Sequence, residues 1–283
     1  MDRIFTPENL ISLFKAIDSE ELDLILVGGQ AINLWANYYA DRVPALTEYL
    51  PFSSADLDFY GGKLDAIACQ KILGGTINLN RDFEPSPNTG VLIVPTEIQP
   101  LRVDFLGSVF GVGDVELSQS AIVFEGQQQL AGVRVKILNP MLCLEGKLKA
   151  AIGLPQEGRQ DLKHLQMSLL FVKEYIKDTI IIDVRQGLKL IERIAFNIWS
   201  DAGLSLWYRY GIEINSAIPT GTEIDTVDPK WNTFQAIRLP QIERETIKKR
   251  EKYLEVQRNI EARIADDTDS DIGGDSPLDR LRQ

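Results

Sequence analysis

The sequence predicts an α+β protein whose first half mixes strands with helices and whose second half is mostly helical. Up to residue 138, short apolar or alternating runs recur between glycines, prolines and polar residues, which is typical of strands set among helices. From residue 139 onward, apolar residues recur at helical spacing. We therefore expect two domains, 1–138 and 139–265, followed by an acidic, disordered tail at 266–283.

The composition indicates a folded protein and argues against two classes. With 283 residues, 44% of them hydrophobic, the chain can bury a core. No apolar run approaches the roughly 18 residues of a membrane span and the start lacks the order of a signal peptide, so we expect a soluble, cytoplasmic protein without membrane contact. The net charge of −11 argues against binding polynucleotides by bulk electrostatics. Cys69 and Cys143 lie outside any metal-binding pattern and are expected to be buried.

The first helices and strands are predicted from the spacing of apolar residues and from the positions of glycine and proline. Apolar residues at helical intervals predict a helix at 7–17. The apolar run 22–27 ends at Gly28-Gly29, which predicts a strand, a tight turn and then a helix from about Ala31. Residues 40–54 contain two prolines and read as a polar loop.

The remaining elements follow the same rules. Residues 56–60 alternate polar and apolar side chains, as a half-buried strand does, and a helix is expected at 63–73. Further strands are expected at 76–79, 91–94, 101–106, 121–125 and 133–137. Four helices are expected in the second half, beginning at Pro140, after the 153–158 turn, at 184–198 and at 238–264, the last strongly charged.

Three aspartates stand out as candidate metal ligands. Asp56 and Asp58 are two residues apart on a strand, so their carboxylates share one face while Leu57 points to the core. Such an oxygen-rich pair suits Mg²⁺, although a solvated strand face is the competing interpretation. Asp104 lies in a second alternating strand and completes a three-carboxylate site if the two strands share a sheet. Three such groups support two-metal phosphoryl transfer.

The glycine pair and the serines beside the acidic strand are candidate phosphate contacts. Gly28 and Gly29 lack side chains between a strand and a helix, so backbone N–H groups and the positive helix end can approach a phosphate. A simple tight turn is the alternative. Ser53 and Ser54 precede the acidic pair and could hydrogen-bond phosphate, with local backbone bonding as the alternative.

Segments 26–29, 54–59 and 103–105 together resemble the glycine-pair, Asp-x-Asp and late-Asp motifs of the DNA polymerase β-like nucleotidyltransferase superfamily. The resemblance implies a nucleotidyltransferase-like mixed sheet with flanking helices. It also implies that Gly28 and Gly29 hold the nucleoside triphosphate and that Asp56 and Asp58 bind two Mg²⁺ ions. Asp104 would hold the catalytic ion and help to activate the acceptor hydroxyl.

A second likeness narrows the group. Segments 144–150 and 159–162 are similar to helical motifs of the AbiEii group, toxin-type nucleotidyltransferases of bacterial abortive-infection defence. The resemblance implies that Lys147 contacts the triphosphate and Asp161 shapes the nucleotide site. The chain departs from the pattern in three places: 26 residues separate Gly29 from Asp56, Gln160 intervenes between Arg159 and Asp161, and His164 stands where a second acidic residue is usual. We expect His164 to be a surface residue rather than a catalytic one.

Together these features predict a Mg²⁺-dependent enzyme that transfers a nucleoside monophosphate from a nucleoside triphosphate to an acceptor hydroxyl. The likeness to the AbiEii group implies an acceptor such as the 3′ end of an RNA or tRNA, or a protein hydroxyl, and an antitoxin as partner. Two alternatives stay open. One is a small-molecule nucleotidyltransferase of the aminoglycoside-modifying kind; the other is a non-catalytic nucleotide-binding module whose charged helix 238–264 binds a partner.

Overall fold

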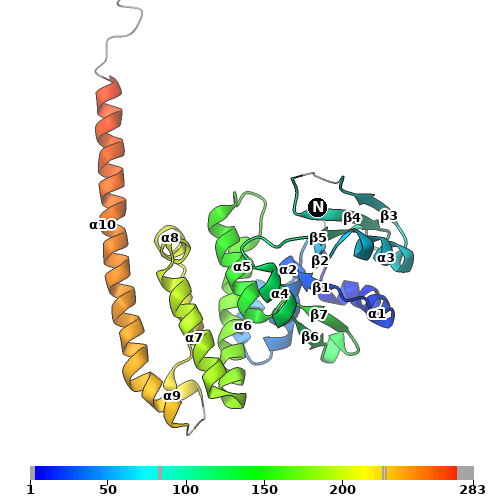
Figure 1. Ribbon diagram of the computed structural model, residues 1–283, viewed down its shortest axis with the longest axis horizontal. Coiled ribbons are helices and arrows are strands. Elements are labelled where there is room, and N and C mark those ends of the chain that lie inside the picture. The colour runs from blue at the N-terminus through cyan, green and yellow to red at the C-terminus, as the bar shows by residue number, and fades with distance from the viewer. Residues whose placement is uncertain (1–3, 82–84, 225, 227, 273–283) are drawn as a thin grey trace, which may run out of the picture.

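The computed structural model describes residues 4–81, 85–224, 226 and 228–272, and within them seven strands form one mixed sheet in the order β3-β4-β5-β2-β1-β7-β6. Figure 1 shows α1 and α3 on one side of this sheet and α5 and α6 on the other. The strands are β1 (Ile25–Val27), β2 (Asp56–Tyr60), β3 (Thr76–Leu79), β4 (Asn88–Val94), β5 (Leu101–Leu106), β6 (Ile122–Glu125) and β7 (Arg134–Ile137).

The centre of the sheet carries the candidate acidic residues. Strand β2 pairs antiparallel with β1 and parallel with β5. Leu57 and Phe59 are fully buried, while Asp56, Asp58 and Tyr60, which alternate with them, keep some exposure. The ring of Phe59 stacks on that of Phe105 in β5, with centroids 6.2 Å apart. The predicted alternation of a core face and a polar face is therefore confirmed on both strands.

Four helices surround the sheet: α1 (Ile11–Ser19), α2 (Gly28–Tyr39), α3 (Lys63–Leu73) and α4 (Asp114–Ser120). Helix α2 begins at the glycine pair itself, three residues earlier than expected, because Gly28 has a positive φ of 66° that turns the chain directly out of β1. Helix α4 was not predicted. It is short and polar and buries only Leu117, so it has no apolar periodicity to detect.

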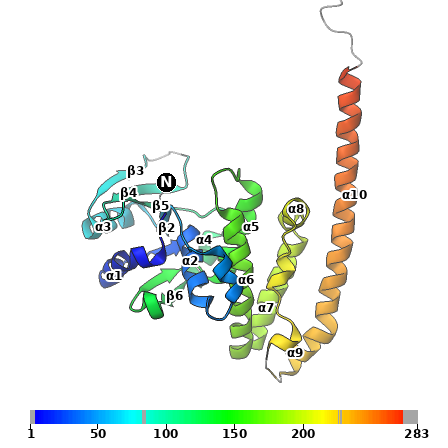
Figure 2. The same cartoon turned by 180° about the vertical axis from the view of Figure 1, so that it is seen from behind.

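The second half is helical, as predicted, and its helices lie in successive layers outward from the sheet (Figures 1 and 2). They are α5 (Pro140–Gly153), α6 (Asp161–Ile182), α7 (Val184–Trp199), α8 (Asp201–Tyr210), α9 (Pro229–Thr233) and α10 (Leu239–Ile272). Short 3₁₀ helices span Pro7–Leu10, Pro44–Tyr49, Gln128–Leu130, Ile214–Ala217 and Gly221–Glu223, and a π-helical turn spans Phe234–Arg238.

The start of helix α5 is fixed by an N-cap residue and by a hydrogen bond to the sheet domain. The Asn139 side chain accepts a hydrogen bond from the N–H of Leu142 (2.9 Å), and Pro140 occupies the first helical position of α5. The indole of Trp35 in α2 donates to the carbonyl of Leu138 (2.8 Å). Helix α5 therefore leaves the sheet domain at a position fixed by both a cap and a long-range hydrogen bond.

The 40–54 segment is more ordered than the polar loop that we expected. It contains the 3₁₀ helix Pro44–Tyr49, and Leu46 and Phe52 are buried. Arg42 pairs with Asp178 of α6 at 2.7 Å. The backbone of Ser54 exchanges two hydrogen bonds with Phe5, at 2.8 and 3.1 Å. The segment is therefore attached to the body just before the acidic strand.

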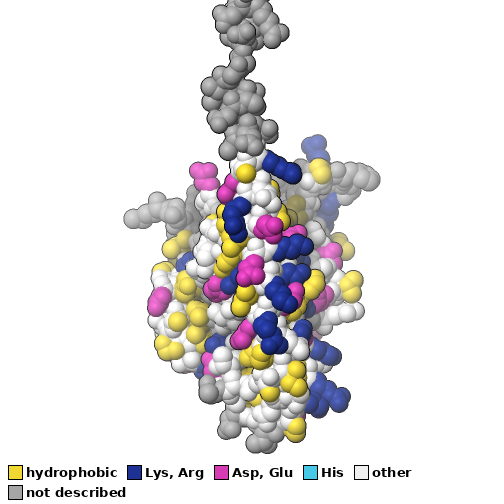
Figure 3. Space-filling model, turned by 90° about the vertical axis from the view of Figure 1, so that its left-hand side faces the viewer, with side chains coloured by type: hydrophobic (Ala, Val, Ile, Leu, Met, Phe, Trp, Pro, Cys, Tyr) yellow, Lys and Arg dark blue, Asp and Glu magenta, His cyan; other side chains and the backbone are white. Residues whose placement is uncertain are grey.

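Helix α10 runs along the outer edge of the molecule and extends past α7 and α8 (Figure 1). It continues to Ile272, so residues 266–272 of the expected disordered tail are helical, while 273–283 lie outside the described residues. Figure 3 shows basic, acidic and hydrophobic side chains interspersed on the face that carries α10. Within the basic run 248–252, Arg250 pairs with Glu213 (2.6 Å) and lies over the ring of Trp207. Among the described helices, none has the length and apolar content needed to cross a bilayer.

Candidate functional site

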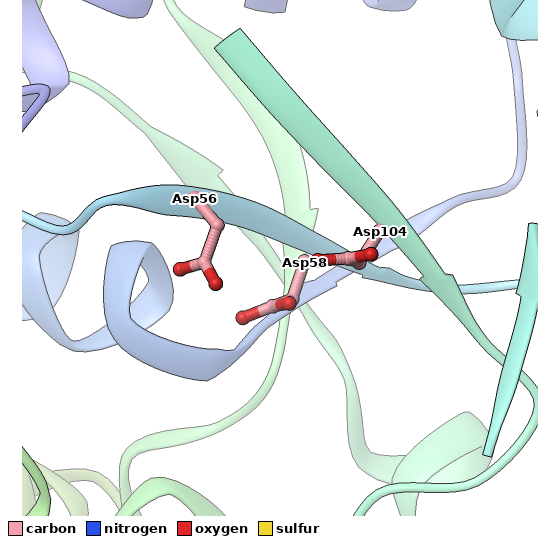
Figure 4. Close-up of side chains that lie close together, drawn as sticks. All are labelled: Asp56, Asp58 and Asp104. Atoms are coloured by element: carbon pink, nitrogen blue, oxygen red, sulfur yellow. The ribbon is translucent and has the colours of Figure 1, made fainter. Parts of the chain in front are cut away.

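Asp56, Asp58 and Asp104 come together at one point on the sheet. Each offers a carboxylate oxygen that lies within 4.8 Å of the others. Figure 4 shows Asp56 and Asp58 extending from β2 to the same side, with Asp104 reaching them from β5. The predicted condition, that the two strands pair in one sheet, is confirmed by the register Asp58↔Asp104. The arrangement could hold a divalent cation, for which carboxylate oxygens are preferred ligands.

The crowding of negative charge shows in the acidity of Asp58. Burial, followed by the charges of Asp56 and Asp104, raises the pKa of Asp58 from 3.8 to about 8. The cations Lys147 and Arg102 oppose this rise but do not cancel it. A divalent cation between the carboxylates would remove the repulsion, so the residues fit a metal site.

Asp104 has partners that the sequence analysis did not identify. Arg102, two residues earlier on β5, donates to both of its carboxylate oxygens at 2.8 and 2.9 Å, and Asn88 of β4 donates at 3.2 Å. Arg102 and Asp104 share a face of β5 by the same two-residue rule that unites Asp56 and Asp58. The spacing of two residues on a strand was therefore enough to predict that Arg102 lies beside Asp104.

Glycine is required at position 28 because the chain turns there directly beside Asp58. Its predecessor Val27 pairs with Asp58 across β1 and β2, so the chain turns into α2 directly beside that carboxylate. A Cβ on Gly28 would lie 2.0 Å from Asp58 Oδ2. A Cβ on Gly29 would lie 2.6 Å from Ser54 Oγ. The glycine pair thus lets the N-terminus of α2 approach the acidic cluster more closely than any side chain would permit.

The two serines act on protein groups in this structure. Ser54 Oγ donates to Asp56 Oδ1 at 3.1 Å and so orients one of the candidate ligands. Ser53 Oγ donates to the carbonyl of Pro51, which is the local bonding considered as the alternative. The contact of Ser54 with phosphate stays a prediction.

Lys147 and Asp161 form an ion pair at the edge of the site. Lys147 Nζ lies 2.7 Å from one Asp161 oxygen, and Arg159 Nε lies 2.5 Å from the other. Burial alone would raise the pKa of Asp161, but Lys147 and Arg159 outweigh it and hold that pKa below its usual value. Lys149 points elsewhere, as expected from its spacing, and donates to the carbonyl of Gly111 at 2.7 Å.

His164 is not the surface residue that we expected. It is only 3% exposed, and neither ring nitrogen has a hydrogen-bond partner among the described residues. Burial, with a further contribution from Lys147 and Lys163, lowers its pKa to about 3. The expectation failed because α6 lies against α2, which places His164 Cε1 only 2.9 Å from the position that a Cβ on Gly29 would occupy.

Two cavities meet at this cluster, and both are lined by Asp56, Asp58, Lys147 and Arg159. The larger, of about 700 Å³, contains Gly28 and a mostly apolar wall that includes Ile32, Val109, Phe110, Leu142 and Leu154. The smaller, of about 210 Å³, is polar and adds Gly29, Ser54, Gln160, Asp161 and His164. The larger cavity thus suits an apolar ring system, and the smaller one, which combines three carboxylates with two cations and a helix N-terminus, suits an anion bound together with a divalent cation.

Comparison of the chain with protein-family models, with curated proteins and with solved structures found no match. What the site can do is therefore inferred from its own residues. It combines clustered carboxylates, an open helix N-terminus and a lysine at the junction of an apolar and a polar cavity. Groups of these kinds bind and polarise phosphate esters in the presence of divalent cations.

Proposed function

We propose that this protein is a Mg²⁺-dependent nucleotidyltransferase. It transfers a nucleoside monophosphate from a nucleoside triphosphate to an acceptor hydroxyl and releases pyrophosphate. The observation that carries the proposal is the convergence of Asp56, Asp58 and Asp104 within 4.8 Å beside the glycine turn that opens α2. Clustered carboxylates at a helix N-terminus match a substrate that is both metal-bound and polyanionic.

The three aspartates have different roles in this proposal. Asp56 and Asp58 would hold both ions, and Asp104 would hold the catalytic ion and orient the acceptor hydroxyl. When bound, Mg²⁺ makes the attacking hydroxyl more acidic and neutralises charge on the leaving pyrophosphate. The raised pKa of Asp58 supports this assignment, because it reflects burial of the carboxylate and, after that, the charges of Asp56 and Asp104, and a bound cation would counter both.

In this proposal the two cavities hold different parts of the nucleotide. The apolar wall around Phe110 and Leu142 suits a nucleobase and sugar, and a volume of about 700 Å³ is ample for both. Lys147, only 16% exposed, adds a positive charge at the junction where the α-phosphate would lie. The backbone at Gly28 and Gly29 would hold the phosphates by N–H groups that have no partner within the helix.

The acceptor and the biological role are proposed from the resemblance to the AbiEii group. It suggests the 3′ end of a tRNA or other RNA, or a protein hydroxyl, as acceptor, and a toxin of an antiviral toxin–antitoxin system restrained by an antitoxin. An enzyme of this kind would work in the cytoplasm, where nucleoside triphosphates and RNA are available.

The test is a transfer assay with matched aspartate variants. The purified protein is incubated with Mg²⁺, each labelled nucleoside triphosphate in turn, and total RNA or protein. We expect label in an acceptor with the wild type, and its loss with Asp58→Asn and with Asp104→Asn. The control is Asp23→Asn, an 84% exposed carboxylate paired at the surface with Lys136. Transfer that survives either active-site change would refute the proposal.

A further inference from the structure

The smaller cavity contains a residue that the proposed transfer does not yet use. His164 is the single histidine of the chain, and both of its ring nitrogens are buried without a hydrogen-bond partner among the described residues. A neutral imidazole has one N–H donor and one acceptor nitrogen, and leaving them unpaired in a buried position costs free energy. A ligand that enters this cavity can supply the missing partner.

The walls of this cavity carry charges of both signs and suit an anion that binds together with Mg²⁺. Gly29 brings the first turn of α2, whose N–H groups point outward and whose dipole favours negative charge. Lys147 and Arg159 add two positive charges, Asp161 balances one of them, and Asp56 and Asp58, which also line the cavity, bring negative charge that a bound Mg²⁺ would offset. The space itself depends on Gly29, because a Cβ there would meet both Ser54 and His164.

His164 is placed to donate a hydrogen bond rather than to ligate the metal. In the described residues, the group of ligating atoms within 4.8 Å of one another consists of Asp56, Asp58 and Asp104 and leaves His164 out. Burial keeps the pKa of His164 near 3, so its imidazole is uncharged at neutral pH. Phosphate oxygens accept hydrogen bonds, and a neutral imidazole N–H can provide one.

We propose that the smaller cavity holds the terminal phosphates of the nucleotide and that His164 donates an N–H to one of their oxygens, which makes it a residue that selects for triphosphates. The direction of the phosphate chain rests on the proposed function, which puts the α-phosphate at Asp56 and Asp58. Because both cavities share these aspartates, a nucleoside in the larger cavity extends its phosphate chain into the smaller one.

A single histidine makes the first test direct, since its imidazole signals need no assignment. The full chain, labelled with ¹⁵N, is observed by NMR while Mg²⁺ with pyrophosphate, a nucleoside triphosphate or the matching monophosphate is added. We expect pyrophosphate and the triphosphate to shift the protonated ring nitrogen, and the monophosphate to leave it unchanged. A triphosphate that binds without moving the His164 signals overturns the proposal, as does a failure of all three ligands to bind.

The second test compares affinities. His164→Leu is expected to weaken binding of the triphosphate and of pyrophosphate about 10- to 100-fold, and to leave monophosphate binding in place. His164→Gln, which keeps a donor, is expected to recover part of the loss. Gln166→Leu, an exposed position on the same helix, serves as the control. Equal losses for triphosphate and monophosphate would indicate a merely structural role and contradict the proposal; if His164→Leu misfolds, the NMR experiment on the wild type decides.

Failure of this inference and failure of the proposed function are distinguishable. If pyrophosphate shifts His164 but no acceptor becomes labelled, the phosphate site stands and the transfer proposal falls. If the wild type labels an acceptor and His164→Leu does so with an unchanged KM for the triphosphate, the transfer proposal stands and the inference about His164 falls.

Discussion

Asp58 and Asp104 occupy paired positions on the parallel strands β2 and β5, so both carboxylates leave the same face of the sheet. Asp56 joins them from two residues earlier on β2. Ionising all three carboxylates in this small volume costs free energy through burial and mutual repulsion, so the pKa of Asp58 rises to about 8 and Asp58 keeps a proton at neutral pH while no metal is bound. A bound cation would offset this cost, which makes the cluster testable through stability as well as activity.

Magnesium is expected to stabilise the folded protein. At a concentration of 100 times Kd, a ligand that binds only the folded state adds about 2.7 kcal/mol to the free energy of unfolding. For a chain of this size, that corresponds to a rise in Tm of roughly 4 to 5 °C. Thermal unfolding of the protein, first in EDTA and then with Mg²⁺, measures this rise in Tm. Asp58→Asn should lose the rise and Asp23→Asn should keep it; an equal rise in both would place the ion elsewhere.

The stability of the metal-free protein is expected to fall as pH rises from about 6.5 to about 8; below pH 6.5 the buried, uncharged His164, whose pKa is lowered to about 3, has the opposite effect and offsets that of Asp58. The pKa of Asp58 is raised to about 8 in the folded state, so in this window the folded chain holds a proton that the unfolded chain has released. The free energy of unfolding then decreases with pH, by up to about 1.4 kcal/mol per pH unit for this group. Urea unfolding in EDTA at pH 6.5 and 7.5 measures the difference.

Two comparisons isolate the contribution of Asp58 to this pH dependence. Asp58→Asn should flatten it, because the amide does not titrate. Stabilisation by Mg²⁺ should grow over the same window, because the ion requires the deprotonated carboxylate. If the metal-free stability of the wild type and that of Asp58→Asn change by the same amount between pH 6.5 and 7.5, the assignment is contradicted.

Replacement of Gly28 by alanine should destroy the metal site more than it harms the fold. The new Cβ would stand 2.0 Å from Asp58 Oδ2, so the carboxylate has to move. The positive φ of 66° adds a backbone cost of about 1 to 2 kcal/mol. Gly211→Ala is the matched control, because its φ is 64° and a Cβ there meets nothing within 4 Å. Stabilisation by Mg²⁺ should vanish in the first variant and persist in the second.

Arg102 is expected to compete with the metal for Asp104. Its guanidinium donates to both oxygens of that carboxylate, but 52% of the Arg102 side chain is exposed, so the pair contributes only about 1 kcal/mol to stability. Arg102→Met should therefore lower the stability slightly in EDTA and strengthen Mg²⁺ binding several-fold. Isothermal titration with Mg²⁺ measures the affinity; a weaker affinity would show instead that Arg102 orients Asp104 for the ion.

The central strands could be predicted because apolar and polar side chains alternate along β2 and β5. The alternation in β2 and β5 indicated which residues point to the core, and the bounds of α3, β3 and β5 match the predicted ones. Helix α8 was missed because Gly203 and polar residues interrupt its pattern, although Ser200 caps its start and Gly211 its end in the usual way. The sequence pattern of a single segment was therefore enough to predict a helix or strand wherever buried residues recur at regular spacing along it.

The features that escaped prediction depend on contacts between distant segments. His164 sits beside Lys163 in the sequence and resembles a solvated position, yet its burial comes from α6 packing against α2. The ion pair between Lys147 and Asp161 likewise joins two helices, and spacing within either helix does not reveal it. Arg102 is different, because the two-residue rule that identified the aspartates applied to it equally.

Lys147 and Lys149 provide the sharpest test of how the helical half contributes to the site. They are two residues apart on α5; the first lines both cavities, and the second bonds to the carbonyl of Gly111. Lys147→Met removes the cation nearest the proposed α-phosphate, so nucleoside triphosphate affinity should fall at least tenfold, since hydrogen bonds to charged groups contribute about 1.5 to 3 kcal/mol.

Stabilisation by Mg²⁺ should survive Lys147→Met, because the three aspartates are unchanged. Lys149→Met carries the same change of charge and size and should leave nucleotide affinity within about twofold, since a surface substitution costs little. Titration of both variants with a labelled nucleoside triphosphate in the presence of Mg²⁺ compares them. Equal losses would show that net charge, rather than the position of Lys147 at the junction of the two cavities, controls binding.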